Sequence, residues 1–327
     1  MMRLAGIDIG TLTCRLLIAD LAPSGWLIEV RSDRRILRLG EGVDHAKHLS
    51  GAAVDRVLQC LKEWRELIDA SAVDATAAVA TSAVRDAVNR DEFLDRVKRE
   101  AGFEIEILTG DEEAHRTLLG IRSGLPVGVS DVLALDIGGG STEFILDRPG
   151  QKSVVRSIDI GVVRLCERFL HHDPPTEDEV RQACEWVARE TRAAVAGMDN
   201  YQTATFVGTA GTVTSLAAMA QKLPAYEPAR IHNYELQLST IQELERTLLS
   251  RKKADRAGLP GLEKGREEVI AAGAIIIRTV MEALCEKGCL VSDLGLREGV
   301  LIELATKIQS VLGSEKVYEQ IQVPRLL

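Results

Sequence analysis

Near the middle of the chain the sequence reads Leu133-Ala-Leu-Asp-Ile-Gly-Gly-Gly-Ser-Thr-Glu-Phe-Ile-Leu146. An apolar run ends at Asp136, three glycines and two hydroxyl residues follow, and a second apolar run begins after Glu143. This order predicts a strand, a tight turn and a returning strand. Glycine tolerates φ > 0 and carries no Cβ, and successive backbone N–H groups in such a turn form a concave site for anionic oxygens. An acid at each end of the turn suggests that a cation joins the acids to the bound anion.

The chain contains a second copy of this pattern, Leu4-Ala-Gly-Ile-Asp-Ile-Gly-Thr-Leu-Thr-Cys-Arg-Leu-Leu-Ile18. An apolar strand again leads into Asp8 and a turn, and an apolar strand returns. A single glycine-rich turn favours phosphate binding over a merely tight hairpin, and two matching turns strengthen that interpretation. The repeat predicts a duplication, with two similar domains facing each other across a cleft where ligands commonly lie.

Length and charge limit the function. A chain of 327 residues that is 46% hydrophobic and 27% charged is expected to form two globular domains. The net charge of −9 argues against nucleic acid and membrane surfaces as partners. A polyanionic substrate would therefore need a local basic patch, for which Arg34, Arg35 and Arg38 are candidates. The absence of a signal-peptide pattern and the six scattered cysteines predict a reducing, cytoplasmic compartment.

Periodicity and capping residues predict an α/β order that is repeated in each half of the chain, with three strands followed by alternating helices and strands. The predicted strands are 3–8, 14–20, 26–31, 75–80, 104–108, 132–136, 142–147, 153–158, 203–207 and 289–291, and the predicted helices are 51–70, 83–87, 90–101, 111–123, one from about 162, 177–198, 211–220, 239–249, 266–286 and 297–312. Consecutive strands favour antiparallel hairpins, and the later alternation favours parallel strands joined by crossover helices.

The predicted domains are 1–123 and 124–296, each a mixed sheet flanked by helices. The helix 297–312 is expected to pack back on the first domain, and 313–327 forms a tail.

A group of acids opens the predicted helix at 111–123. Thr109 and Glu112 have the spacing of a capping box, which gives Glu112 a structural role. Glu113 is not needed for that box. From the residues alone, Glu113 is either a general base or, as the more frequent case, a surface acid that stabilises the helix dipole.

Two further motifs follow predicted strands and open helices. Arg85 of Thr81-Ser-Ala-Val-Arg85 is either a solvated arginine or a guanidinium fork for phosphate. Gly208-Thr-Ala-Gly-Thr212 is either an anion-binding helix start or a crowded crossing that needs small residues.

Seven stretches, in order and over roughly the whole chain, resemble the exopolyphosphatase / guanosine pentaphosphate phosphatase family. They are Gly6-Ile-Asp-Ile-Gly10, Arg38-Leu-Gly-Glu-Gly42, Thr81-Ser-Ala-Val-Arg85, Thr109-Gly-Asp-Glu-Glu-Ala114, Asp136-Ile-Gly-Gly-Gly-Ser-Thr-Glu143, Gly208-Thr-Ala-Gly-Thr212 and Leu294-Gly-Leu-Arg-Glu-Gly-Val300. The family belongs to the actin / sugar kinase / Hsp70-like fold. The resemblance therefore implies two actin-like (ribonuclease H-like) α/β domains and hydrolysis of a terminal phosphoanhydride.

The resemblance also assigns roles to residues. It places the catalytic glutamate at Glu113, in preference to the surface-acid interpretation, and Mg²⁺ or another divalent cation at Asp136 and Glu143. The residues that it implies for phosphate binding are Gly10, Thr11, Thr13, Arg85, Gly138, Gly139, Gly140, Ser141 and Thr142. One departure is Leu12, where the family usually has asparagine, so the ligand preference of the first turn is open.

The expected function is a Mg²⁺-dependent exopolyphosphatase that releases orthophosphate from polyphosphate, with guanosine pentaphosphate as a further substrate. The alternative is a sensor that binds guanosine tetraphosphate or pentaphosphate with little turnover, and a sugar kinase of the same fold is a weaker third. Longer members of the family imply a homodimer.

Overall fold

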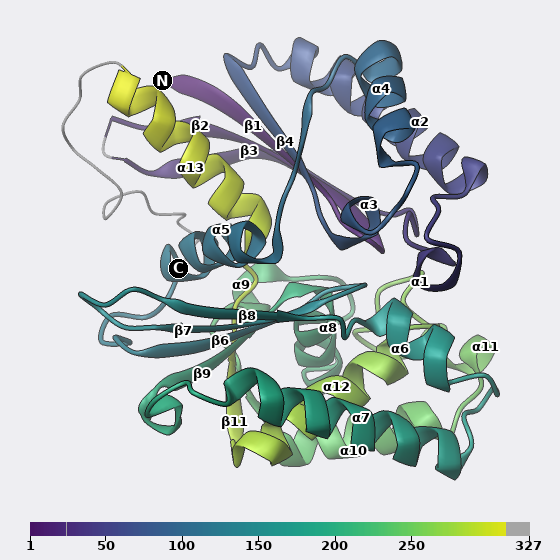
Figure 1. Ribbon diagram of the computed structural model, residues 1–327. Coiled ribbons are helices and arrows are strands. Elements are labelled where there is room, and N and C mark those ends of the chain that lie inside the picture. Colours follow the sequence, from purple (N-terminus) through teal and green to yellow (C-terminus); the bar gives the residue numbers. More distant parts are fainter. Residues whose placement is uncertain (24, 312–327) are drawn as a thin grey trace. The chain divides into compact units, whose positions relative to one another are not determined.

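The computed structural model describes residues 1–23 and 25–311 (Figure 1). Contacts between residues divide the chain into two compact units, Met1–Gly124 with the described residues from Leu294 onwards, and Leu125–Asp293. The predicted tail 313–327, and residue 312 of the last predicted helix, lie outside the described residues.

The first unit contains a mixed five-stranded sheet with the order β3-β2-β1-β4-β5. Its strands are β1 (Met2–Ile9), β2 (Thr13–Leu21), β3 (Leu27–Ile36), β4 (Ala75–Ala80) and β5 (Ile105–Ile107). The first three strands pair antiparallel, whereas β4 and β5 join β1 in parallel. The carboxyl ends of β1, β4 and β5 consequently meet at one edge of the sheet.

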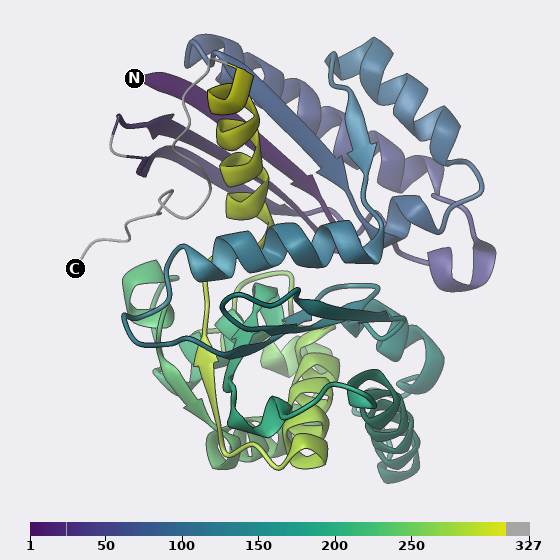
Figure 2. The ribbon, with the colours of Figure 1, turned by 60° about the vertical axis from the view of Figure 1, so that its left-hand side comes forward.

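Helices cover both faces of this sheet. Successive residues of its central strands are apolar, so apolar side chains point to both faces. Leu16 and Ile18 belong to the core beneath α2 (Gly51–Ala70) and α4 (Arg90–Ala101). Leu17 and Ala19 belong to a second core under α13 (Leu296–Val311), which crosses β1 and packs on α5 (Gly110–Arg122), as Figure 2 shows. Two four-residue helices, α1 (Val43–Ala46) and α3 (Ser82–Arg85), complete the unit.

The second unit repeats the same sheet order and adds one edge strand, giving β10-β11-β9-β6-β7-β8. Its strands are β6 (Val132–Ile137), β7 (Thr142–Asp147), β8 (Val154–Ile158), β9 (Thr205–Thr209), β10 (Glu235–Gln237) and β11 (Gly288–Val291). Strands β6, β7 and β8 pair antiparallel, and β9 and β11 are parallel to β6. The predicted duplication of a mixed α/β unit is therefore present in the structure.

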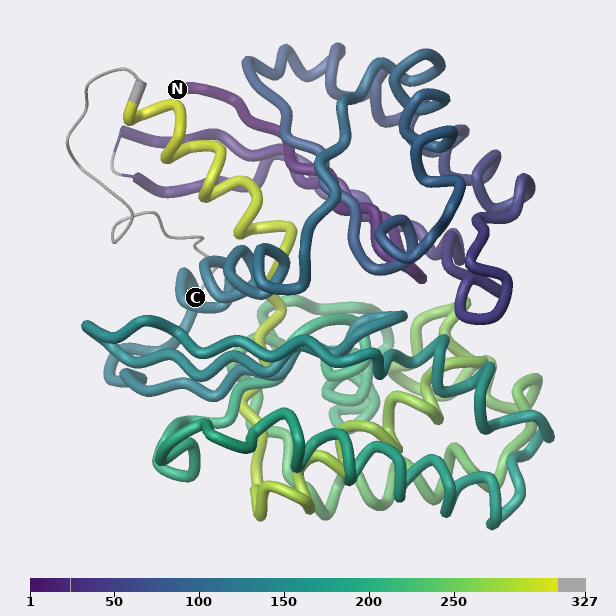
Figure 3. Tube along the Cα trace, viewed as in Figure 1, coloured from purple at the N-terminus to yellow at the C-terminus, as the bar shows by residue number. Residues whose placement is uncertain are grey.

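The helices of the second unit are organised around the apolar helix α12 (Figure 3). They are α6 (Val162–Phe169), α7 (Glu177–Val195), α8 (Ala210–Ala220), α9 (Pro228–Ile231), α10 (Leu238–Leu249), α11 (Lys253–Arg256) and α12 (Ile270–Leu284). A helix that is buried nearly all round needs neighbours on every side, and α12 contacts α6, α7, α8 and α10 as well as β6.

The crossing of α5 and α13 requires glycine, which gives a stability prediction. A Cβ added at Gly120 would lie 2.0 Å from the backbone oxygen of Gly295. Because this oxygen belongs to the backbone, the helices would have to separate, so Gly120→Ala should lower the free energy of unfolding by about 2 kcal/mol or more. Urea unfolding of the whole chain measures this change.

The control is Gly51→Ala, a glycine-to-alanine change in the first turn of α2. A Cβ at Gly51 would meet nothing within 4 Å, so the free energy of unfolding should stay within about 0.5 kcal/mol of the wild-type value. Equal stability of the two variants would show that the α5–α13 crossing does not depend on the close approach at Gly120.

Candidate active site

The two copies of the turn have the same backbone geometry. The N–H of Gly10 donates to the Thr13 carbonyl at 3.0 Å, and the N–H of Gly138 donates to the Ser141 carbonyl at 3.0 Å. Each turn follows the carboxyl end of the strand at the centre of its sheet, β1 or β6. Ligands of open α/β sheets commonly bind beyond the carboxyl ends of parallel strands.

The first glycine of each turn is required for space and not for an unusual φ. A Cβ would lie 2.9 Å from the Thr13 oxygen at Gly10, and 3.1 Å from the Ser141 oxygen at Gly138. Neither residue has a φ in the left-handed region. The expectation that glycine serves these turns through φ > 0 is therefore wrong at both positions, whereas the argument from the missing Cβ holds.

The second turn is oriented by the start of α6. Backbone N–H groups of Val162 and Val163 donate to the carbonyls of Gly138 and Gly139, and Arg164 Nε donates to the Gly140 carbonyl at 2.9 Å. The N–H of a trans peptide points away from its carbonyl. Because the three carbonyls face α6, the N–H groups of the following residues point away from that helix, as an anion site requires.

Contacts in the first unit join the first turn to α3. Thr11 Oγ1 lies 2.8 Å from Ser82 Oγ, and the N–H of Thr81 donates to the Ile9 carbonyl at 3.2 Å. No role was predicted for Ser82, because a hydroxyl inside a motif carries no signal for a partner 71 residues away. The predicted residues Thr11 and Arg85 thus belong to one connected group.

Glu113 and Arg85 are in direct contact. The Arg85 Nη1 group donates to the Leu108 carbonyl at 2.7 Å and to Glu113 Oε2 at 3.2 Å. The predicted capping box of Thr109 and Glu112 is present, and Glu113, the next residue, is only 8% exposed. Burial rules out the surface-acid interpretation of Glu113. Glu113 is therefore a buried carboxylate paired with a cation, and a carboxylate can accept a proton from water.

Asp136 and Glu143 form the matching acidic group of the second unit. They are directly opposite in the antiparallel pair β6–β7, and both are buried, 8% and 1% exposed. Ser157 Oγ donates to Glu143 Oε1 at 2.8 Å. Directly opposite residues have Cβ atoms roughly 4.5–5.5 Å apart, where like charges repel. Two buried oxygen ligands at this spacing fit a hard divalent cation.

A cation at these residues would need other ligands as well. Among the described residues there is no cluster of three or more His, Cys, Asp or Glu side chains suited to a metal. Magnesium typically keeps several waters and binds through one or two carboxylates together with substrate phosphates, a donor set with which the pair Asp136 and Glu143 is compatible.

Three residues near the turns have side chains that face the protein interior. Leu12 is 6% exposed, and its carbonyl accepts from the N–H groups of Leu37 and Arg38. The Thr142 hydroxyl, predicted to bind substrate, donates to the Ile160 carbonyl at 2.5 Å. Thr13 is 8% exposed in β2. The Leu12 side chain is therefore buried, and the polar contacts at this position are made by its backbone carbonyl.

One arginine of the predicted basic patch, Arg35, makes contacts within the protein. Arg35 pairs with Glu63 and with Asp33, and its guanidinium lies 6.0 Å from the centre of the Trp64 ring. Such contacts explain Arg35 as a residue that fastens β3 to α2.

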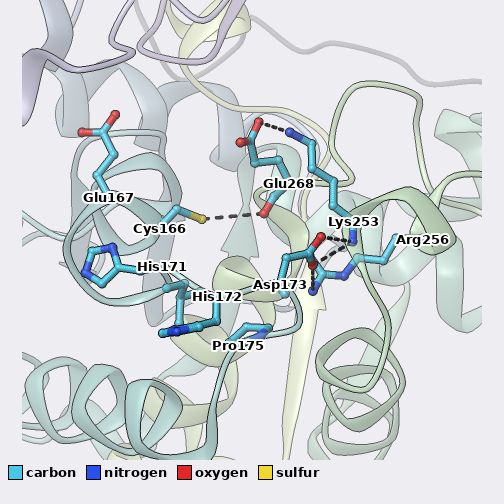
Figure 4. Close-up of a pocket in the computed structure, with 11 residues that line it drawn as sticks. Cys166, Glu167, His171, His172, Asp173, Pro175, Lys253, Arg256 and Glu268 are labelled. Atoms are coloured by element: carbon cyan, nitrogen blue, oxygen red, sulfur yellow. Dashed lines mark hydrogen bonds and ion pairs between the residues drawn. The ribbon is translucent and has the colours of Figure 1, made fainter.

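A cavity of about 350 Å³ in the second unit is lined by none of the predicted site residues (Figure 4). Its cations are already paired, Lys253 with Glu268 at 3.0 Å and Arg256 with Asp173 at 4.0 Å. Burial raises the pKa of its thiol, Cys166, to about 12, so this cysteine is a poor nucleophile.

The sequence profile of the Ppx/GppA phosphatase family matches residues 17–308. The chain belongs to the Ppx/GppA phosphatase family. Exopolyphosphatase 2 of Mycobacterium tuberculosis is 36% identical over 317 residues, which cover 93% of this chain and 98% of the relative. The family resemblance inferred from seven motifs is confirmed.

Solved structures of Ppx/GppA proteins agree with the fold described above. A family member from Aquifex aeolicus is 36% identical with a TM-score of 0.79, covering 94% of this chain and 98% of its own. An exopolyphosphatase from Cytophaga hutchinsonii is 27% identical with a TM-score of 0.85, covering 96% and 99%. The predicted two-domain α/β architecture and the phosphatase class are confirmed.

Proposed function

We propose that this Ppx/GppA protein hydrolyses the terminal phosphoanhydride of inorganic polyphosphate and releases orthophosphate, with guanosine pentaphosphate as a further substrate. The observation that carries the proposal is the buried Glu113, held by Arg85 at the carboxyl edge of the first sheet. The names of the relatives from Mycobacterium tuberculosis and Cytophaga hutchinsonii support polyphosphate as the substrate.

Glu113 acts on water in the proposed reaction. Its carboxylate accepts a proton from the water that attacks the terminal phosphorus, and Arg85 keeps it in place through Oε2. Glu113 Oε2 and the Leu108 carbonyl share one nitrogen of Arg85. The other guanidinium nitrogens are proposed to donate to oxygens of the phosphoryl group, whose charge must be stabilised during transfer.

Each backbone turn is proposed to contribute contacts to phosphate. The N–H groups of Gly139, Gly140 and Ser141 point away from α6, and they are proposed to donate to phosphate oxygens. The Thr11 hydroxyl is proposed to do the same from the first turn.

Asp136 and Glu143 are proposed to hold Mg²⁺. If bound by these carboxylates, Mg²⁺ would supply positive charge to stabilise the phosphate oxygens. The placement of the two carboxylates supports this role, because both are buried and lie directly opposite each other on β6 and β7.

The metal proposal gives a test by titration. Glu143→Gln keeps the shape and removes one charged ligand, so a higher Mg²⁺ concentration, by about tenfold or more, should be needed for half-maximal rate. Chelation should abolish phosphate release by the wild type, and added Mg²⁺ should restore it. The control is Glu235→Gln, which changes an exposed glutamate on the edge strand β10. An unchanged Mg²⁺ dependence in Glu143→Gln would remove Glu143 from the metal site.

A side-by-side substrate comparison tests the function itself. Phosphate release from long-chain polyphosphate and from guanosine pentaphosphate is measured with the wild type, together with a binding titration of guanosine tetraphosphate and pentaphosphate. Release from polyphosphate is the expected result. Tight binding of the guanosine compounds without release from either substrate would favour the sensor.

The cellular setting stays a proposal. All six cysteines are free thiols in the described structure, including the exposed Cys285. Free thiols support a reducing, cytoplasmic compartment. No helix within the described residues has the length and apolar character to cross a membrane. The homodimer implied by longer relatives remains a prediction.

A further inference from the structure

Thr11 of the first turn is held through both branches of its side chain. Its Oγ1 lies 2.8 Å from Ser82 Oγ, and both residues are buried, 7% and 3% exposed. Its Cγ2 occupies the space beside Gly40, where an added Cβ would lie only 2.2 Å away. A β-branched side chain has few χ1 rotamers, and any rotation of χ1 would break both contacts at once.

The segments that hold Thr11 are fixed by the backbone. The N–H of Gly40 donates to the Thr11 carbonyl at 2.9 Å, and the N–H of Arg38 donates to the neighbouring Leu12 carbonyl at 2.9 Å. Ser82 opens α3, three residues before Arg85. The turn is therefore fastened to the segment 38–42 on one side and to the helix that carries Arg85 on the other.

We propose that Ser82 and Gly40 are positioning residues that fix the Thr11 hydroxyl for phosphate binding; this inference rests on the proposed function. A hydroxyl carries one proton, so within the Thr11–Ser82 pair either oxygen can donate. A fully ionised phosphate oxygen only accepts. Thr11 therefore donates to phosphate when Ser82 donates to Thr11, and the bound phosphate selects this proton order.

Gly40 contributes through its size. The methyl group of Thr11 fills the volume next to Gly40, which keeps Oγ1 turned toward Ser82. Gly40 does not have a left-handed φ, so alanine at this position meets the Thr11 methyl group and not a backbone restriction. Ala83 Cβ, at 3.1 Å, is the next contact.

The first test is a double-mutant cycle between Thr11 and Ser82, measured as the Kd of tripolyphosphate by calorimetry and as KM and kcat for polyphosphate. Ser82→Ala should weaken binding by about 2- to 12-fold, the range of one neutral hydrogen bond, with kcat nearly unchanged. In the Thr11→Val background, which lacks the hydroxyl, Ser82→Ala should add little further loss. Equal losses in both backgrounds, or no loss in either, would overturn the role of Ser82.

The second test enlarges residue 40 with Gly40→Ala, both in the wild type and in a variant whose residue 11 is smaller. Gly40→Ala should reduce kcat/KM for polyphosphate and affinity for tripolyphosphate by about tenfold or more, because Thr11 must leave its rotamer. Thr11→Ser removes the methyl group, so Gly40→Ala should cost less than about threefold when made in the Thr11→Ser variant. The same loss in both backgrounds would show that Gly40 acts independently of Thr11.

The two readouts separate this inference from the proposed function. Coupling in tripolyphosphate affinity without phosphate release from polyphosphate would leave the positioning role standing and reject the exopolyphosphatase. Phosphate release by the wild type without coupling between Thr11, Ser82 and Gly40 would support the exopolyphosphatase and reject the positioning role. A wild type that binds no tripolyphosphate would overturn the positioning role.

Discussion

Glu113→Gln is expected to lower kcat for phosphate release by about 10²- to 10⁴-fold, the range of a positioned general base. Glutamine keeps the length of the side chain, and its amide oxygen can accept the hydrogen bond that Arg85 Nη1 donates at 3.2 Å. It cannot accept a proton from water at neutral pH. KM should stay near its wild-type value or fall, because Arg85 loses its negative partner. Initial rates at saturating polyphosphate measure the effect.

The matched control is Glu112→Gln, the same change one residue earlier. Glu112 Oε2 accepts from the Thr109 N–H at 2.8 Å in the capping box, and a glutamine oxygen can keep that bond. Its kcat should stay within a few-fold of the wild type. Near-normal turnover of Glu113→Gln would exclude Glu113 as the base, and an equal loss in both variants would point to a disturbed α5 instead.

Arg85→Ala should differ from Glu113→Gln by raising KM as well as lowering kcat. Loss of one preorganised donor to a developing charge costs about 10²- to 10³-fold in rate, and the guanidinium also contributes to binding of the ground state. Steady-state kinetics with polyphosphate separate the two parameters. Unchanged KM and kcat would show that Arg85 has only a structural role, the hydrogen bond from α3 to the Leu108 carbonyl.

The control for Arg85 is Arg99→Ala, which removes the same charge from an exposed position on α4. The Arg99 side chain is 67% exposed and lies 3.6 Å from Glu100. An ion pair of this kind contributes little to stability, so both kinetic parameters should remain close to wild-type values. A similar KM increase in both variants would indicate a general charge effect on the approach of polyphosphate.

Some periodic helices were predictable from the sequence to the residue, whereas the predicted helix 177–198 ends at Val195 and the predicted helix 266–286 spans Ile270–Leu284. The helix over Gly51–Ala70 and its Ser50 cap agree with the prediction, because buried positions at helical spacing and a capping hydroxyl act locally. The four-residue helices α1 and α11 and the three-residue strand β10 were not predicted. Elements of this length span little more than one pattern period, so no periodicity can be recognised in them and their conformation depends on contacts that the local sequence does not contain.

Strand β3 shows another limit of periodicity. It continues to Ile36, five residues beyond the predicted end, through Arg34 and Arg35. The register against β2 shifts between Ile18 and Ala19, which breaks the alternation of faces. The strand also lies at the edge of its sheet, where charged residues are favoured because they discourage pairing with other chains. The predicted strand therefore ended at Arg31, before this charged run.

The candidate site was only partly predictable. The two turns were evident because each motif is contiguous, and the capping box separated Glu112 from Glu113 through local spacing. The contact of Arg85 with Glu113 spans 28 residues, and that of Thr11 with Ser82 spans 71. Such contacts arise from the parallel pairing of β1, β4 and β5. Motif spacing along the chain carries no information about them.

The duplicated turns differ at one register position, and this difference bears on where a cation can bind. Asp136 is opposite Glu143 in the second copy, whereas Asp8 is opposite Arg15 in the first. Two opposed acids attract a cation, whereas an arginine at the second position supplies a positive charge of its own. In the proposed reaction, the duplication therefore does not double the metal site, because only the second copy presents two opposed carboxylates at this position.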